Sequence, residues 1–132
     1  VNNKSEVVTK LAQDLFTNGY IDDVSAFVDD VYLRELEGQT GIGGYIAIPH
    51  SKSKHVKKIG VAIGINKKEI PWETLDGKGV KVVILFAVGD DKESARDHLK
   101  LLSLFAKKLG REEVVSRLLD AKDTSDVIAA FK

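Results

Sequence analysis

Apolar residues recur every three or four positions in the first stretch of the chain, over residues 8–15. This 3.6-residue period predicts a helix that buries one face. Ser5 precedes the stripe and is a residue type that caps helix starts. The dipeptide at residues 18 and 19, Asn-Gly, is typical of a helix end, so we expect one helix between these points.

A second apolar stripe occupies residues 24–31, with the same period. Aspartates at positions 22 and 23 predict the start of this helix, because Asp accepts hydrogen bonds from the first backbone N–H groups. Gly38 is expected to end it. The pair Arg34-Glu35 then falls in the last turns, just before a glycine-rich segment.

The middle of the chain changes to patterns typical of strands. Short apolar runs at residues 45–48 and 59–65 predict two strands, and a glycine-rich turn precedes the first. Residues 80–88 are rich in β-branched side chains and apolar nearly throughout, which predicts a central strand covered on both faces. Pro, Trp and Asp-Gly between the last two strands indicate a loop over residues 66–79.

The last third returns to helical periods. One helix is expected to open at residue 90 or 91 and to stop at Gly110, a second to span residues 111–119, and a third, capped by Thr124, to run through Phe131. Two helices, three strands and three helices predict one layered α/β or α+β domain.

Composition narrows the classes of function. The 132 residues include 20 basic and 20 acidic side chains, a formal net charge of zero, which argues against a nucleic-acid or membrane-surface protein. There is no cysteine, so a thiolate nucleophile, a disulfide and a Cys-ligated zinc are excluded. No apolar run approaches the roughly 20 residues needed to cross a bilayer, and no signal peptide is visible. We expect a cytoplasmic location.

The segment TGIGGYIAIPH, residues 40–50, holds three glycines and a histidine behind a proline. It is not a dinucleotide fingerprint, because it follows a helix and precedes a strand, and because Ile46 stands where a small residue is needed. The glycines predict a tight turn. Alternatively, their N–H groups form a small anion-binding nest, to which Thr40 adds a hydroxyl donor.

His50 is placed by the residues before it. Pro49 has a fixed φ and biases Ile48 toward an extended conformation, so His50 is expected at the end of the strand with a defined orientation. Open α/β sheets bind ligands at strand ends. An imidazole with a pKa of about 6.5 is mostly neutral at neutral pH and can be a nucleophile, base or metal ligand. The alternative is an ordinary surface histidine.

The other two histidines have different settings. His98 shares the apolar stripe of its helix with leucines and a phenylalanine, which favours a core histidine, although it could line a pocket near the helix N-terminus. His55 lies among four lysines, as in a solvated loop or in a positive rim that attracts anions. A zinc site made of His50, His55 and His98 is conceivable, but no acidic spacing supports it.

Several ordered motifs resemble one known family. The stretches RELEGQTGIGGYIAIPHSK, IPWETLDGKGVKVVILFAV and DHLKLLSLFAKKL resemble the EIIA domain of the phosphoenolpyruvate-dependent sugar phosphotransferase system, fructose–mannitol type. The resemblance covers most of the chain. It implies a single α/β domain over residues 1–132, with a mixed central β-sheet flanked by helices.

The resemblance also implies an activity. His50 would accept a phosphoryl group from the phosphocarrier protein HPr and pass it to a cysteine of the EIIB domain of a sugar permease, which makes the domain a phosphotransferase with a phosphohistidine intermediate. His98 would be a hydrogen-bond partner beside the phosphohistidine, and Arg34 a phosphoryl clamp. No metal or cofactor is required. The family pattern has Gly where Ser51 stands, and a polar residue or glycine where Tyr45 stands.

Phosphoryl transfer depends on positioning and charge stabilisation, which suggests further contacts. Thr40, Gly41, Gly43 and Ser51 are the predicted phosphoryl-binding residues. Two alternatives stay open. The domain could be a regulatory EIIA-like module, in a nitrogen-related relay or fused to a transcription regulator, whose phosphorylation is a signal. It could also be a non-enzymatic anion- or nucleotide-binding domain in which His50 is incidental.

Overall fold

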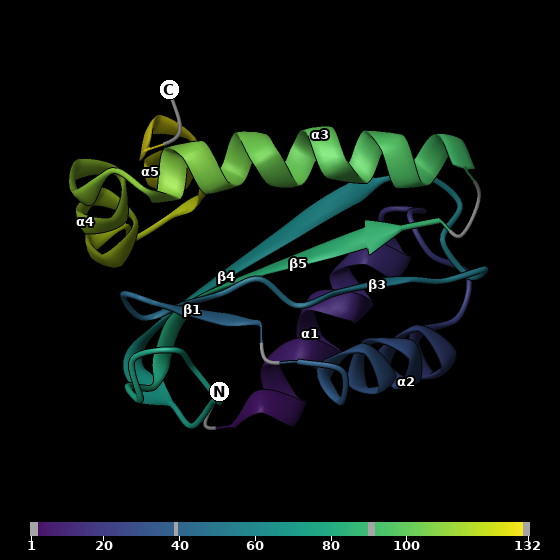
Figure 1. The fold of residues 1–132 in the computed structure, drawn as a ribbon, viewed down its shortest axis with the longest axis horizontal. Coiled ribbons are helices and arrows are strands. Elements are labelled where there is room, and N and C mark those ends of the chain that lie inside the picture. Colours follow the sequence, from purple (N-terminus) through teal and green to yellow (C-terminus); the bar gives the residue numbers. More distant parts are fainter. Residues whose placement is uncertain (1–2, 39, 90–91, 131–132) are drawn as a thin grey trace.

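The computed structural model describes residues 3–38, 40–89 and 92–130 (Figure 1). The first helix, α1, spans Lys4–Thr17, and its cap is Asn3, whose side chain accepts a 2.8 Å hydrogen bond from the Glu6 N–H. The Asn3 amide also donates to the Glu6 carboxylate, so the two residues are joined by two hydrogen bonds. The predicted cap, Ser5, is therefore wrong, because the helix has already begun there.

The second helix, α2, spans Val24–Glu35 and begins as predicted. Asp23 accepts from the Ala26 N–H at 3.0 Å. The helix ends three residues before the expected Gly38, and the chain continues through tight turns over residues 36–38. Arg34 and Glu35 are the last two residues of the helix, as expected. The Glu35 side chain contacts Thr40, which directly precedes β1.

A mixed β-sheet lies at the centre, which confirms the predicted α/β fold class. Its longest inner strand, β5, pairs with β4 in antiparallel fashion on one side and with β2 and β3 in parallel fashion on the other; β1 pairs with β2. The strands are β1 (Gly41–Gly43), β2 (Ile46–Ala47), β3 (His50–Lys52), β4 (Gly60–Ile70) and β5 (Val80–Val88).

Three strand predictions need correction. The glycine-rich segment was expected to be a turn only, yet it forms β1 before the turn. The strand expected over residues 45–48 is reduced to β2, because Tyr45 has φ +68° and belongs to the turn. The strand predicted over residues 59–65 continues to Ile70, which pairs with Val80 beyond an irregular stretch of polar residues that have no strand pattern of their own. Only β5 matches its prediction fully.

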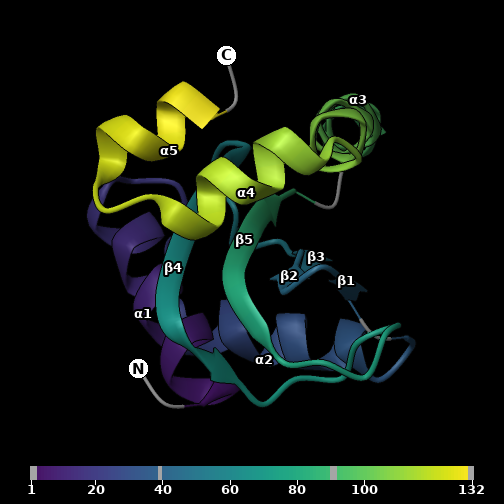
Figure 2. The same ribbon diagram turned by 90° about the vertical axis from the view of Figure 1, so that its left-hand side faces the viewer.

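Helices cover both faces of β5, and its side chains alternate between two apolar cores. Val83, Leu85 and Ala87 pack with the buried faces of α1 and α2. Val82, Ile84, Phe86 and Val88 pack on the other side with residues of three C-terminal helices. These helices are α3 (Lys92–Leu109), α4 (Glu112–Asp120) and α5 (Thr124–Ala130). Figures 1 and 2 show α1 and α2 on one face of the sheet and α3, α4 and α5 on the other.

The three C-terminal helices agree with the sequence patterns within a residue or two. The predicted opening at residue 90 or 91 and the predicted end at Phe131 lie outside the described residues. Asp123 accepts from the Asp126 N–H at 2.9 Å and caps α5, so the predicted cap, Thr124, is wrong, because it is already the first residue of the helix. Within the described part of the chain, no helix is both long enough and apolar enough to cross a membrane.

Candidate functional site

The edge of the sheet is interrupted between β2 and β3, and this interruption places His50. Pro49 has no N–H to donate to the sheet, but its carbonyl accepts from the Phe86 N–H at 3.0 Å. Pairing resumes at once, with His50 opposite Phe86. His50 is therefore the first residue of a second strand segment, near the carboxyl end of β5, and not a residue released after the strand has ended.

The orientation of the His50 ring is fixed by a backbone carbonyl. Its Nδ1 lies 2.8 Å from the carbonyl oxygen of Ile48. A carbonyl oxygen can only accept, so Nδ1 must carry the hydrogen. In the neutral ring the lone pair is then on Nε2. The interruption at Ile48-Pro49 thus selects one tautomer of the histidine that follows it.

The surroundings of His50 lower its pKa below the usual value. Burial of the half-buried ring is the largest cause, because the charged form loses solvation. The hydrogen bond to Ile48 and the charge of Glu35 act in the opposite direction, and the charge of Arg34 adds to the lowering. The ring is therefore kept neutral, which is the form that can act as a nucleophile.

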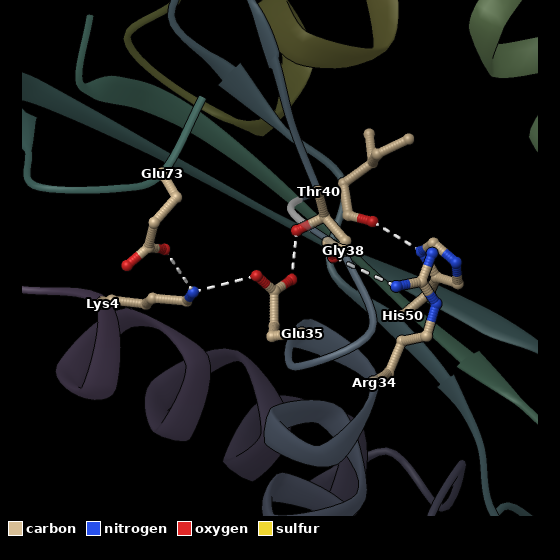
Figure 3. Close-up of polar contacts among 8 residues, drawn as sticks. Lys4, Arg34, Glu35, Gly38, Thr40, His50 and Glu73 are labelled. Atoms are coloured by element: carbon tan, nitrogen blue, oxygen red, sulfur yellow. Dashed lines mark hydrogen bonds and ion pairs between the residues drawn. The ribbon is translucent and has the colours of Figure 1, made fainter. Parts of the chain in front are cut away.

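Arg34 approaches His50 from the last turn of α2 (Figure 3). Its Nη1 donates to the carbonyl of Gly38 at 3.1 Å, and its Nε lies 4.0 Å from the carboxylate of Glu37. Both partners belong to the turn that follows the helix. The charge of Arg34 acts on His50, so the structure brings a cation and a neutral imidazole together. The family resemblance implied that these two side chains would be neighbours.

Glu35 is a feature that sequence reasoning missed. Its carboxylate is almost buried and accepts from the hydroxyl of Thr40 on one oxygen and from Lys4 on the other, at 2.9 Å. Lys4 also contacts Glu73 at 2.9 Å. Figure 3 shows these residues in one row beside His50. The only hint in the sequence was that Glu35 directly follows Arg34. Its partner on α1, Lys4, is 31 residues away, and no pattern around Lys4 indicates the contact.

The glycine turn lies apart from His50. Gly43 is opposite Ile46, which pairs with Val82, whereas His50 pairs with Phe86. Four residues along β5 correspond to about 13 Å, and Gly41, opposite Ala47, is about 10 Å away by the same measure.

An anion does lie at this turn, and it is a carboxylate of the protein itself. The Gly44 N–H donates to Asp76 at 3.1 Å. The hydrogen bonds from Gly44 and from the Lys78 N–H lower the pKa of Asp76. The glycine-rich turn therefore fastens the loop that contains Asp76 to the end of β1.

The remaining predicted residues are placed only by their backbones. Ser51 lies in β3 and His98 in α3, and the side chains of both are outside the described part of the structure. His55 is turned toward Asp22, with 2.9 Å between Nδ1 and the carboxylate, and so ties two loops together. The described residues contain no group of three or more His, Cys, Asp or Glu that could hold a metal ion.

Comparison with known proteins gives one consistent family. The family model described as phosphoenolpyruvate-dependent sugar phosphotransferase system, EIIA 2, matches residues 1–132. The chain is 30% identical over 129 residues to the 2-O-alpha-mannosyl-D-glycerate-specific EIIABC component of Escherichia coli; this covers 97% of the chain but 20% of that protein. It is 31% identical over 128 residues to the fructose-like EIIA component of E. coli, covering 97% of the chain and 84% of that protein.

Solved structures share the fold. Nitrogen regulatory protein IIA-Ntr from Neisseria meningitidis superimposes with a TM-score of 0.89 at 23% identity, over 100% of this chain and 88% of that one. A structure described as a complex of enzyme IIAMTL and phosphorylated enzyme IIBMTL from E. coli gives a TM-score of 0.79 at 22% identity, over 99% and 88%.

Proposed function

The chain belongs to the EIIA 2 family of the phosphoenolpyruvate-dependent sugar phosphotransferase system, and we propose that it carries a phosphoryl group on His50 between two partner proteins. The observation that carries this proposal is the 2.8 Å contact between Nδ1 and the Ile48 carbonyl. It directs the lone pair of the neutral ring to Nε2, so the nitrogen that would accept the phosphoryl group is set before any partner arrives.

The chemical step follows from this tautomer. The Nε2 lone pair attacks the phosphorus of the phosphorylated donor, HPr, and the bond between phosphorus and the donor breaks as the new N–P bond forms. The imidazole ring then has bonds to phosphorus on Nε2 and to hydrogen on Nδ1, and it gains positive charge. The Ile48 carbonyl accepts from that N–H and stabilises the charge. A thiolate of the EIIB domain would take the phosphoryl group in the second step.

Charge stabilisation of the phosphoryl oxygens is assigned first to Arg34. Its positive charge acts on His50, and its guanidinium can exchange the neutral Gly38 carbonyl for a charged phosphoryl oxygen. We also retain Ser51 and His98 as proposed phosphoryl contacts, on the strength of the family resemblance. The separation of about 10 Å or more along the strand makes Gly41 and Gly43 weaker candidates.

The surface beside the site suits a protein partner. Leu33 and Leu36 are exposed on either side of Arg34-Glu35, and they line a groove of about 580 Å³ with Tyr32. The same groove is lined by Glu35, and exposed leucines that line a groove are typical of a docking surface. The solved complex of a related fold with a phosphorylated IIB protein supports EIIB as one partner. We further propose that HPr is the phosphoryl donor and that the protein acts in the cytoplasm. Residues 1–132 would act there as one EIIA domain.

Reconstitution of the relay tests it. The domain is incubated with phosphoenolpyruvate, enzyme I and HPr, and the modified residue is mapped. We expect an acid-labile, base-stable phosphoryl group on His50 in the wild type and none in His50→Ala. His55→Ala serves as the matched control, since that histidine is bound to Asp22 and should leave labelling intact. Label that persists in His50→Ala would remove His50 from the role of acceptor.

A regulatory role is the second candidate, and the likeness to a nitrogen regulatory protein, with a TM-score of 0.89, is the observation that favours it. The two roles share the first transfer and differ in the second. Transfer from the phosphorylated domain to a purified EIIB domain of a sugar permease would support sugar transport. A phosphorylated domain that passes its group to no such EIIB would favour signalling.

A further inference from the structure

A continuous chain of hydrogen bonds leads from α1 to the reactive ring. Lys4 contacts one oxygen of Glu35, and the Thr40 hydroxyl donates to the other. The Thr40 carbonyl accepts from the Ile48 N–H at 3.0 Å. The Ile48 carbonyl, in turn, accepts from His50 Nδ1 at 2.8 Å. Each group in this chain fixes the next one, and the last one fixes the histidine; Figure 3 shows Lys4, Glu35, Thr40 and His50 along it.

The first two members of this chain, Lys4 and Glu35, are charged and largely buried. The side chain of Glu35 is 6% exposed and that of Lys4 is 19% exposed. A carboxylate removed from water in this way is tolerated only when both oxygens have partners. Glu35 meets this requirement with a cation on one oxygen and a hydroxyl on the other. Both its position and that of Thr40 are therefore strongly determined.

The backbone at residues 48 and 49 converts this anchoring into ring orientation. Pro49 restricts Ile48 to an extended conformation. When the Ile48 N–H is held by Thr40, the direction of the Ile48 carbonyl is held as well. That carbonyl decides which nitrogen of His50 carries the hydrogen. A group that fixes Thr40 thus acts on His50 through the backbone and without touching the ring.

We propose that Glu35 is a positioning residue for phosphoryl acceptance, which orients His50 through Thr40 and the Ile48 peptide. The proposal rests on the function assigned to His50 above and adds a residue to it. It also changes the role suggested for Thr40. The hydroxyl hydrogen of Thr40 points to Glu35, so Thr40 holds the strand edge and does not donate to the phosphoryl group while this bond persists.

Two pairs of variants separate this role from others. Glu35→Gln keeps the size of the side chain but replaces one carboxylate oxygen by an NH2 donor, so it cannot accept from Lys4 and Thr40 at the two positions that the carboxylate oxygens occupy. Glu73→Gln is its control, because it removes one carboxylate charge from the same lysine and leaves the Glu35–Thr40 bond. Thr40→Val deletes the hydroxyl at nearly constant shape, and Thr40→Ser restores it.

Two measurements are made on each variant whose circular dichroism matches the wild type. One is the rate of phosphoryl acceptance from phosphorylated HPr. The other is the tautomer of the His50 ring, from the nitrogen chemical shifts of Nδ1 and Nε2 in the unphosphorylated domain. Glu35→Gln and Thr40→Val should slow acceptance about tenfold, as loss of a supporting partner typically does, and should mix the two tautomers. Glu73→Gln and Thr40→Ser should match the wild type in both.

The outcomes distinguish the two proposals. A wild-type domain that is not phosphorylated would overturn the function assigned to His50, while the tautomer measurement would still test the positioning. Unchanged tautomer and rate in a folded Thr40→Val would overturn the positioning role. A slower Thr40→Val with an unchanged tautomer would also overturn it, in favour of direct contact between the hydroxyl and the phosphoryl group.

Discussion

The reactivity of a single residue, His50, depends on the balance of the groups around it. Burial and Arg34 lower its pKa, while the Ile48 carbonyl and Glu35 partly offset them. Because the folded pKa lies below the ordinary value of about 6.5, the ring stays neutral to a lower pH than a free imidazole does. We therefore expect the midpoint of the acid-side decline in phosphoryl acceptance to lie below about pH 6.5.

Replacement of Arg34 tests the electrostatic part of this balance. A cation disfavours a second positive charge, so Arg34→Gln should raise the pKa of His50 and move the midpoint of the decline to higher pH. The midpoint is read from a titration of the His50 ring signals and from the initial rate of phosphorylation against pH. Arg34→Lys retains the charge and should retain the midpoint, although its single ammonium group binds phosphoryl oxygens less well. A midpoint unmoved in Arg34→Gln would contradict this account.

Gly41 has no side chain, and this allows the loop at residues 73 and 74 to approach the strand edge closely. A Cβ at this position would lie 2.5 Å from the Glu73 carbonyl oxygen and 2.5 Å from Cγ2 of Thr74. Backbone cannot move away as a side-chain tip can, so Gly41→Ala should lower the free energy of unfolding by about 3 kcal/mol. Gly44→Ala is the comparison, since its φ of +63° is unfavourable but its surroundings are open; we expect a loss of about 1 kcal/mol.

Urea unfolding measures both glycine variants. The ratio of the two losses is the informative quantity, because it separates a clash with backbone from conformational strain alone. Equal losses would mean that the loop containing Glu73 moves aside at little cost.

At the scale of elements, the sequence predicted those helices and strands that are determined by their own residues. The helices were predictable from apolar period, and the start of α2 from the Asp23 cap. The strand β5 was predictable because its side chains are apolar on both faces. The extension of β4 to Ile70 and the strand β1 were not. The extension depends on the pairing of Ile70 with Val80 beyond unpatterned polar residues, and β1 on the pairing of glycines with β2.

The attachment of α1 gives an element-scale prediction. Lys4→Met would leave the Glu35 carboxylate buried without its cation, and removal of one partner from such a pair costs about 3 kcal/mol. The pKa of Lys4 is raised, although burial alone lowers it, because hydrogen bonds with Glu35 and then Glu73 outweigh burial. The charged pair is therefore the form present at neutral pH.

Glu73→Gln is the matched control for Lys4→Met. The Glu73 side chain is 68% exposed, so its ion pair with Lys4 is screened by water and should contribute less than about 1 kcal/mol. Thermal and urea unfolding of the two variants should give clearly different losses. If both variants lose the same small amount, the Lys4–Glu35 pair does not hold α1 to the sheet.

At the scale of the whole molecule, the candidate site contains some contacts that could be predicted from the sequence and others that could not. Arg34 and His50 were predicted together from motifs, and the structure places them together. The link from Lys4 to Glu35 could not be predicted, because it depends on how α1 packs beside α2. The phosphoryl contacts expected of Gly41 and Gly43 stay a prediction. The hydrogen bond from Gly44 to Asp76 could not be predicted, because it depends on which loop the sheet brings opposite the turn.

The surface that would receive partners provides the last prediction. Leu36 is 84% exposed and lines the groove beside the site. A carboxylate there would oppose an apolar contact with HPr, so Leu36→Glu should raise the KM for phosphorylated HPr about tenfold, a loss of roughly 1.4 kcal/mol, with little change in kcat. Phe16→Glu places the same charge at an exposed apolar residue of α1, 46% exposed, that does not line the groove, and it should leave KM unchanged.

The split between KM and kcat decides what the groove does. A residue that only contacts the docked partner changes its binding, whereas a residue that orients His50 changes the step after binding. A fall in kcat with constant KM in Leu36→Glu would therefore mean that the substitution disturbs the neighbouring Glu35 and its hold on Thr40. Equal effects of Leu36→Glu and Phe16→Glu on KM would mean that added charge alone matters, and that the groove is not where HPr docks.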